Sequence, residues 1–216
     1  MTDAADLEIR PPRQQRSREA WNRVLDAGVA LLEEGGFDAF TIAAVCGRAR
    51  VAPPAIYART TSKDALFLAV YEHGISRLLA DQRIFDDAAR WAELSVEALV
   101  RAAVAEVVGI PLRHQPFLRA VVLISAAHPE VQRRGARYSK QLGEQFNRVL
   151  LPAEHEIRHA DPEAAIRACF DSAFATSIIR VAYGPGFSTP SPRSDDQFVR
   201  DTGEMAVRYL LAQAAP

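Results

Sequence analysis

The chain has 216 residues, of which 49% are hydrophobic and 25% charged, and its formal net charge is −1 at pH 7. These proportions match globular averages and exclude a disordered or fibrous chain, and the length suffices for a sizeable core. The sequence has no apolar run near the roughly 20 residues that span a bilayer and no apolar signal segment at its start, so we expect a cytoplasmic protein with no membrane partner.

The N-terminal end is basic although the whole chain is nearly neutral. Over residues 10–23 five arginines face one acidic residue, a local excess of four positive charges (5 minus 1). Such a segment is either a solvated arm or an arm that contacts phosphates, and its charge alone does not choose between the two. The residues concerned are Arg10, Arg13, Arg16, Arg18, Arg23 and Glu19.

Helical periodicity dominates the chain and predicts an all-α fold. The first helix is expected over residues 17–34, with Ser17 as its cap and Gly35-Gly36 as its stop. Two short helices follow at about 41–48 and 53–59, and the second opens on proline, which is tolerated at the first helical position.

The rest of the chain is predicted to form longer helices. Pro111 is expected to end one of them, and Pro129 limits the next. Asp161 followed by proline opens another, and Asp195 or Asp196 is the expected cap of the last. The predicted ranges are about 62–81, 96–110, 117–128, 131–149, 163–183 and 195–213.

The two short helices and the turn at 49–52 between them have the arrangement of a helix-turn-helix, whose second helix enters the major groove of DNA. Helix pairs of this kind also occur in proteins that do not bind DNA. The spacing therefore does not decide the function, and the individual residues have to.

Residues 18–71 resemble the DNA-binding segment of the tetracycline-repressor (TetR) family in order and spacing. The resemblance implies an N-terminal helix-turn-helix domain of three helices with a basic arm, residues 1–63, and a larger helical ligand-binding and dimerisation domain, residues 64–216. The matching residues are Leu25, Ala27, Leu31-Leu32, Glu34, Gly36-Phe37, Thr41, Val45, Val51, Ile56-Tyr57, Ser62-Lys63-Asp64 and Leu66.

The resemblance also implies a function. A protein of this family is a transcriptional regulator, by default a repressor, that binds a palindromic operator in double-stranded DNA as a homodimer and is released by a small-molecule effector. Its last two helices, here about 163–183 and 195–213, form a four-helix interface between protomers. The two-fold symmetry then places the recognition helices roughly 34–36 Å apart, one turn of DNA.

Three residues are expected to contact DNA phosphates and so to fix the register without reading the sequence. Thr41 can cap its helix and meet a phosphate beside the free backbone N–H groups there. Tyr57 can direct its hydroxyl at a phosphate, and Lys63 brings a positive charge at the next helix start. Taken singly, each has a simpler interpretation, namely a cap, an aromatic residue at the core edge and an exposed lysine.

The predicted recognition helix is poor in hydrogen-bond donors. Pro53, Pro54 and Ala55 can offer bases only apolar surface, such as a contact to a thymine methyl group. Base reading then relies on Arg50, Arg59 or the arm. For Arg59 we expect a phosphate contact, with a surface salt bridge as the alternative.

Three residues depart from the family pattern. Arg50 stands where the turn usually has glycine, so a positive φ there would be strained. Thr60 replaces a phenylalanine behind the recognition helix and weakens the packing. Ala52 replaces a serine cap, at a cost of about 1 kcal/mol, and Pro53-Pro54 can compensate by fixing φ.

The C-terminal helices carry scattered aromatic and polar residues that could line a pocket for a small, partly apolar effector, although most of them would be core residues. The helix that begins after Ser62 would transmit the change to the DNA-binding domain. The candidate ligand-binding residues are Trp91, His114, Phe117, His128, Tyr138, Phe170 and Phe174.

Two other classes of function are less favoured. Cys46 and Cys169 have no metal or redox spacing and are expected to be buried thiols. His155 and His159 could share a helix face, but Glu156 is the only acid between them, so we expect surface histidines and neither a metal site, a cofactor nor an enzyme. A helical dimeric scaffold or adaptor without sequence-specific DNA binding would explain the last two helices but not the resemblance.

Overall fold

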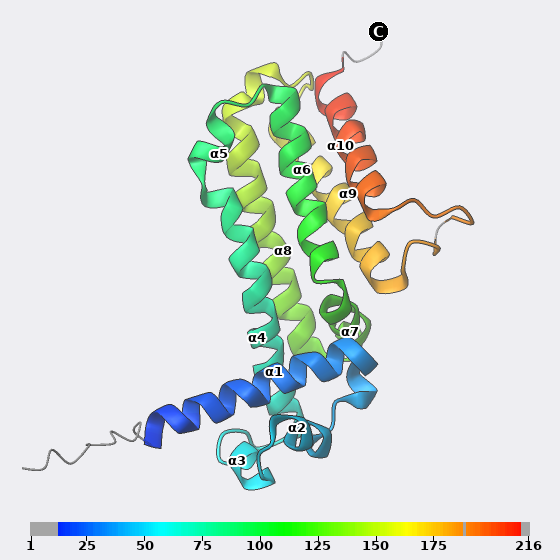
Figure 1. Cartoon of the computed structure of the whole chain (residues 1–216). Helices are drawn as coiled ribbons and strands as arrows, with labels where there is room; N and C mark the ends of the chain where they lie inside the picture. The colour runs from blue at the N-terminus through cyan, green and yellow to red at the C-terminus, as the bar shows by residue number, and fades with distance from the viewer. Residues whose placement is uncertain (1–12, 188, 213–216) are drawn as a thin grey trace, which may run out of the picture. The chain divides into compact units, whose positions relative to one another are not determined.

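The computed structural model describes residues 13–187 and 189–212, and all regular secondary structure within them is helical (Figure 1). The chain forms two compact units, residues 1–73 and 74–216, and the division falls inside helix α4 (Lys63–Gln82). The prediction of an all-α protein with an N-terminal helix-turn-helix domain and a larger helical domain is confirmed. The first unit contains the predicted 1–63 domain together with the first half of α4.

In the described part of the first unit, three helices precede α4: α1 (Arg13–Ala39), α2 (Ile42–Ala49) and α3 (Pro53–Tyr57). The predicted start of the first helix is wrong, because α1 already runs through Ser17. Its predicted stop is confirmed, since Gly36 has φ 65° and ψ −159° and breaks the helical path. This left-handed φ is one that glycine adopts without steric cost.

The core of the first unit is built around two phenylalanines and a close helix contact. Phe40 and Phe67 are fully buried, with their ring centroids 5.8 Å apart. Gly28 lets α1 approach α4, because a Cβ atom at this position would lie 2.4 Å from Val70 Cγ2. The first half of α4 therefore belongs to the core of the first unit.

The second unit is a bundle of helices around a long apolar core. Helix α6 packs against α9 and α10, and α9 also packs against α7 and α8. Short 3-10 turns lie at 83–86 and 151–156. The helices are α5 (Ala88–Ala92), α6 (Val96–Arg113), α7 (Gln115–Ser125), α8 (Pro129–Leu150), α9 (Pro162–Tyr183) and α10 (Asp195–Leu211).

Two helix ends in this unit differ from the predictions. Pro111 does not end α6, which continues to Arg113 with the proline buried. A proline this close to the C-terminus removes one backbone hydrogen bond, and burial of its ring offsets that loss. The cap of α10 is Ser194, not an aspartate: its Oγ accepts from the Gln197 N–H at 3.2 Å, and Gln197 Oε1 accepts from the Ser194 N–H at 3.3 Å.

The predicted cap of α9 and the two predicted buried cysteines are present. Asp161 Oδ1 accepts from the Ala164 N–H at 2.9 Å and caps α9, which ends at Gly184 with φ 84°. Both cysteines are buried thiols, and burial raises the pKa of Cys169 to about 12. The part of the chain that the structure describes contains no cluster of three or more His, Cys, Asp or Glu side chains that could hold a metal ion.

Over the described ranges, no single helix is both long enough and apolar enough to cross a membrane. Helices α6 and α7 reach the required length and composition only as a pair, and they are bent by 83° relative to one another.

Candidate nucleic-acid interface

Helices α2 and α3 form the predicted helix-turn-helix. Thr41 has extended backbone angles, φ −121° and ψ 153°, and its Oγ1 accepts from the Ala44 N–H at 3.1 Å. It is thus the cap of α2, as predicted. Thr41 is exposed and therefore accessible to a phosphate, and the phosphate contact itself stays a prediction. Val45 and Ala49 anchor α2 to the core.

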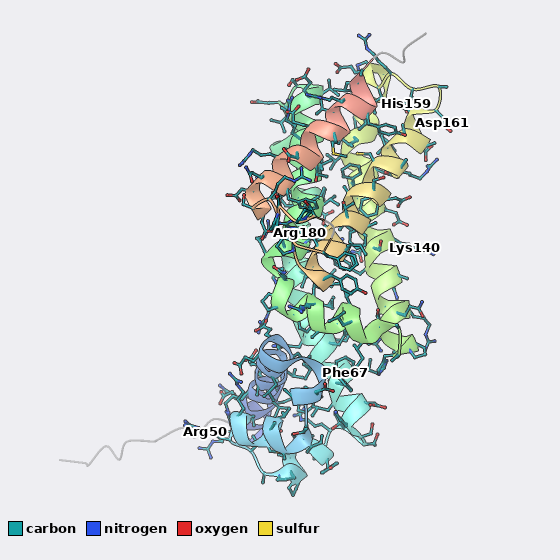
Figure 2. The ribbon with its side chains drawn as sticks, turned by 90° about the vertical axis from the view of Figure 1, so that its right-hand side faces the viewer. Arg50, Phe67, Lys140, His159, Asp161 and Arg180 are labelled. Carbon is teal, nitrogen blue, oxygen red and sulfur yellow. The ribbon has the colours of Figure 1, made fainter. Side chains whose placement is uncertain are left out.

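The turn between the helices is strained at one residue. Arg50 has φ 54° and ψ 51°, and it is the one residue other than glycine with positive φ in the described ranges. Left-handed backbone costs a residue with a Cβ roughly 1–2 kcal/mol relative to glycine. The Arg50 side chain is exposed (Figure 2), so the turn presents a cation beside the recognition helix.

Comparing glycine with alanine at position 50 should separate the effect of the backbone strain from the effect of the arginine charge. We expect Arg50→Gly to raise the free energy of unfolding by about 1 kcal/mol in urea denaturation, because the left-handed strain disappears. The same variant should bind operator DNA more weakly, because it lacks a candidate base-reading cation. Arg50→Ala is the matched control: it removes the charge but keeps the strain. Equal stability of the two variants would contradict the strain.

Helix α3 has five residues and no side-chain cap. Ala52 occupies the cap position without such a hydrogen bond, as expected, and prolines fill the first two helical positions. Ile56 is fully buried and fixes α3 to the core, while Pro53, Pro54 and Ala55 are exposed. The surface offered to a major groove is therefore apolar.

Two of the predicted phosphate-contacting residues lie at the borders of α3 and α4. The Tyr57 side chain is 56% exposed, which does not fit an aromatic residue of the core edge. Lys63 is the first residue of α4, after the Ser62 cap, and its Nζ lies 4.3 Å from the centroid of the Phe37 ring. This cation–π contact orients the ammonium group at the helix start.

The Arg59 side chain contacts α1, and the phosphate contact expected for it stays a prediction. Its guanidinium carbon lies 5.4 Å from the centroid of the Trp21 ring, and its Nη2 donates to Ser17 Oγ at 3.0 Å. Both partners belong to α1, more than thirty residues earlier in the chain. Sequence reasoning missed this contact, because nothing local to Arg59 indicates it.

The basic arm is only partly described. Arg10 lies outside the described residues. Arg16, Arg18 and Arg23 lie on exposed positions of α1, and Arg23 Nε also donates to the Ala49 carbonyl at the end of α2, at 3.4 Å.

Three of the seven residues expected to bind a ligand, Trp91, Phe117 and Phe170, are buried in the core of the second unit. Trp91 is buried, and its indole N–H donates to the Ile84 carbonyl at 3.2 Å. Phe117 is buried against α4, and Phe170 stacks on Phe174 with centroids 5.5 Å apart. His128 and Tyr138 are half-buried on or next to α8. Ligand contact stays a prediction for all of them.

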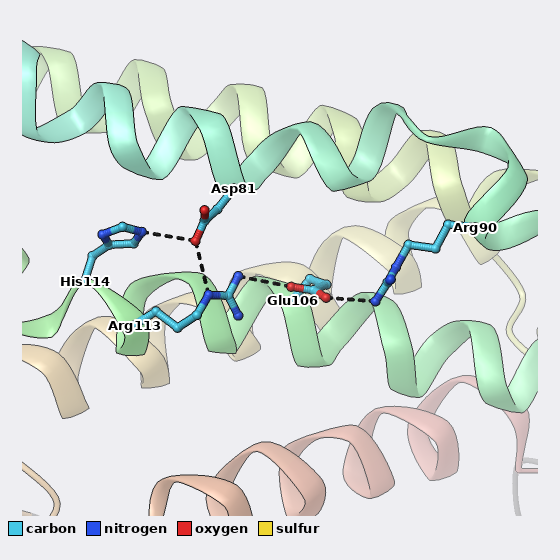
Figure 3. A network of polar contacts seen from close by, with 5 residues as sticks. All are labelled: Asp81, Arg90, Glu106, Arg113 and His114. Carbon is cyan, nitrogen blue, oxygen red and sulfur yellow. Dashed lines mark hydrogen bonds and ion pairs between the residues drawn. The ribbon is translucent and has the colours of Figure 1, made fainter.

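His114 belongs to a polar network instead (Figure 3). The ring Nε2 of His114 and the Nε of Arg113 both lie 3.1 Å from the same oxygen of Asp81, on α4. Arg113 Nη2 also donates to Glu106 Oε2 at 3.2 Å, and Arg90 Nη2 donates to the other carboxylate oxygen of Glu106 at 3.0 Å. Burial alone would raise the pKa of Asp81, but the hydrogen bonds from His114 and Arg113 hold it below its ordinary value. This network, together with a hydrogen bond between the buried Gln82 and Gln145, ties the end of α4 to the bundle.

Helices α9 and α10 share an exposed apolar face with a hollow of about 710 Å³. None of the seven predicted ligand-binding residues lines this hollow. Its wall includes large apolar side chains that are 45–69% exposed: Ile179, Phe187, Met205 and Tyr209. Arg180, labelled in Figure 2, also lines the hollow, and its buried guanidinium donates to Asp195 at 2.8 Å and to the Arg193 carbonyl at 2.6 Å.

Comparison with known proteins identifies the N-terminal unit. Residues 24–70 match the family model described as bacterial regulatory proteins, tetR family. The matched segment begins inside α1 and ends inside α4, so it contains the whole α2–α3 pair. A comparison with curated proteins gives no match.

Solved structures share the fold over 88–92% of this chain. A TetR-like transcriptional regulator from Rhodococcus sp. RHA1 has 21% identity and a TM-score of 0.58, over 92% of this chain and 97% of that one. A bacterial regulatory protein in the tetR family from Rhodococcus RHA1 has 17% identity and a TM-score of 0.65, over 91% and 98%. A TetR/AcrR-family regulator from Thermobifida fusca has 19% identity and a TM-score of 0.63, over 88% of this chain and 96% of that one.

Proposed function

We propose that this chain is a DNA-binding regulator of the tetR family, a homodimeric repressor that binds a palindromic operator and is released by a small-molecule effector. It acts by binding and not by catalysis, in the cytoplasm, where its DNA lies. The observation that carries the proposal is the exposed α2–α3 pair, whose cap, turn and flanking cations are arranged for a DNA backbone.

Two groups of residues, all exposed except the half-buried Lys63, support docking on DNA. Thr41 and Lys63 lie at the N-terminal ends of α2 and α4, where unpaired backbone N–H groups favour phosphates. Tyr57 lies between these two helix ends in sequence, on the exposed side of α3. The apolar Pro53, Pro54 and Ala55 can then meet thymine methyl groups, and Arg50 supplies the donor group that these three lack.

The face shared by α9 and α10 supports the homodimer. Large exposed apolar side chains are costly in water, and a contiguous patch of them marks an interface. The fitting occupant is a second copy of the same face, because two-fold symmetry pairs a patch with itself. This dimer is the four-helix interface expected from the sequence.

Helix α4 is the proposed connection between effector and operator. It belongs to both units, with its first half in the core around Phe67 and its end tied to the bundle through Asp81. An effector that binds better to a dimer with displaced α4 helices would weaken the operator complex. A tenfold weakening needs about 1.4 kcal/mol of differential binding, and linkage requires that the operator weaken effector binding equally.

The proposal is tested by selecting a binding sequence from a random duplex pool and then measuring the salt dependence of the complex. We expect Lys63→Ala to weaken binding about equally for all sequences and to reduce the magnitude of the salt slope by about 1 for each lysine–phosphate pair removed, because one counterion fewer is released. Sequence preference should persist. Lys140→Ala, an exposed lysine of α8 (Figure 2), should change neither quantity.

Failure to select any sequence would make the protein a dimeric scaffold instead. If a sequence is selected but both Lys63→Ala and Tyr57→Phe bind it with unchanged affinity and salt slope, the DNA-facing surface has been assigned to the wrong residues.

A further inference from the structure

The contact between Arg59 and α1 gives this arginine a role of its own in DNA recognition. Arg59 follows α3 directly, and its guanidinium lies over the Trp21 ring while Nη2 donates to Ser17 Oγ at 3.0 Å. A second, longer contact joins Nη2 to the Ser17 carbonyl at 3.5 Å. The flat face and one donor of the side chain are thus engaged within the protein.

The recognition helix needs such a support because little else fixes its C-terminal end. It has five residues and no capping side chain. Ile56 is the one buried residue of α3. Thr60, which follows α3, is also buried, but its hydroxyl donates to the Ile56 carbonyl at 3.2 Å and so does not reach a neighbouring helix. A helix this short contributes almost no stability of its own. Its direction therefore depends on side chains that reach neighbouring helices.

We infer that Arg59 is a positioning residue that fixes the recognition helix to the first turns of α1 and so sets the discrimination between operator and other DNA. This inference rests on the proposed function, because it concerns how the same α3 is aimed at bases. It replaces the phosphate contact expected from the sequence. Planarity is the required property, since stacking on Trp21 and the hydrogen bond to Ser17 both use the guanidinium plane.

The two roles predict different behaviour of Arg59→Lys. Lysine keeps the charge but loses the planar group. A positioning role predicts that Arg59→Lys and Arg59→Met both lower the ratio of operator to scrambled-duplex affinity by about ten-fold, with an unchanged salt slope. A phosphate contact predicts that Arg59→Lys retains the ratio and that Arg59→Met reduces the magnitude of the salt slope by about 1. The latter pattern would overturn the inference.

A second measurement does not need DNA. The backbone N–H groups of Ala58 and Thr60 donate to the carbonyls of Pro54 and Ile56. In the free protein, Arg59→Lys should speed hydrogen exchange at these two amides while leaving α2 unchanged. Unchanged hydrogen exchange at both amides would overturn the inference, whether or not the wild-type protein selects an operator. Failure of the wild-type protein to select an operator would overturn only the proposed function.

Discussion

Replacing Met205 by glutamate is expected to leave the protein folded but monomeric, with operator affinity reduced at least 100-fold. Met205 is 69% exposed in the isolated chain, so the substitution disturbs no packing there. In the proposed dimer the same position is buried, and burying an unpaired carboxylate costs several kcal/mol. Two-fold symmetry places the substitution in the interface twice. Light scattering at micromolar concentration measures the mass, and gel shift measures operator binding.

The matched control is Leu123→Glu. Leu123 lies on α7, is 49% exposed and does not line the hollow between α9 and α10. This variant should remain a dimer and bind operator as the wild type does. A dimeric Met205→Glu, or a monomeric Leu123→Glu, would show that the protomers meet through another surface.

Replacing Gly74 by alanine is expected to lower the free energy of unfolding by about 2 kcal/mol. A Cβ atom at this position would lie 2.2 Å from Phe117 Cζ, and the Phe117 side chain is buried, with only 3% exposed. Overpacking of this kind costs roughly 1–3 kcal/mol, and the better helix propensity of alanine returns only part of it. Urea denaturation followed by circular dichroism measures the change.

Gly135→Ala in α8 is the control, because a Cβ there meets no atom within 4 Å. This variant should gain about 0.5–1 kcal/mol from helix propensity alone. A second test is repair: Phe117→Leu should reduce the cost of Gly74→Ala by opening space beside α4. If both glycine variants were equally stable, the contact between α4 and Phe117 would not be as close as the structure has it.

Several features of the DNA-binding unit were predictable because their causes are local. The Thr41 cap and the proline at the start of α3 follow from bonds within three residues along the chain. The same holds for Asp161 at the start of α9. Strain at Arg50 was expected only if its φ is positive, because the family pattern has glycine at that position. In each case the physical cause lies within one helical turn, which the sequence displays directly.

Features that depend on distant parts of the chain were not predictable. The expected cap of the last helix was Asp195 or Asp196, but the path of the chain into α10 makes Ser194 the cap. Pro111 reads as a helix end, but burial in the bundle keeps it inside α6. The seven candidate ligand residues were chosen by chemical type, and type does not reveal which aromatic side chains fill a core.

The sequence by itself determined the all-helical fold, the helix-turn-helix and its likeness to the tetR family, because periodicity, caps and an ordered motif are properties of neighbouring residues. Only the tertiary structure decided that Arg59 lies on Trp21 and Ser17, that His114 joins Asp81, and that α9 and α10 leave an apolar hollow open. These contacts join residues tens of positions apart, and their partners are fixed by how whole helices pack, which no local pattern encodes.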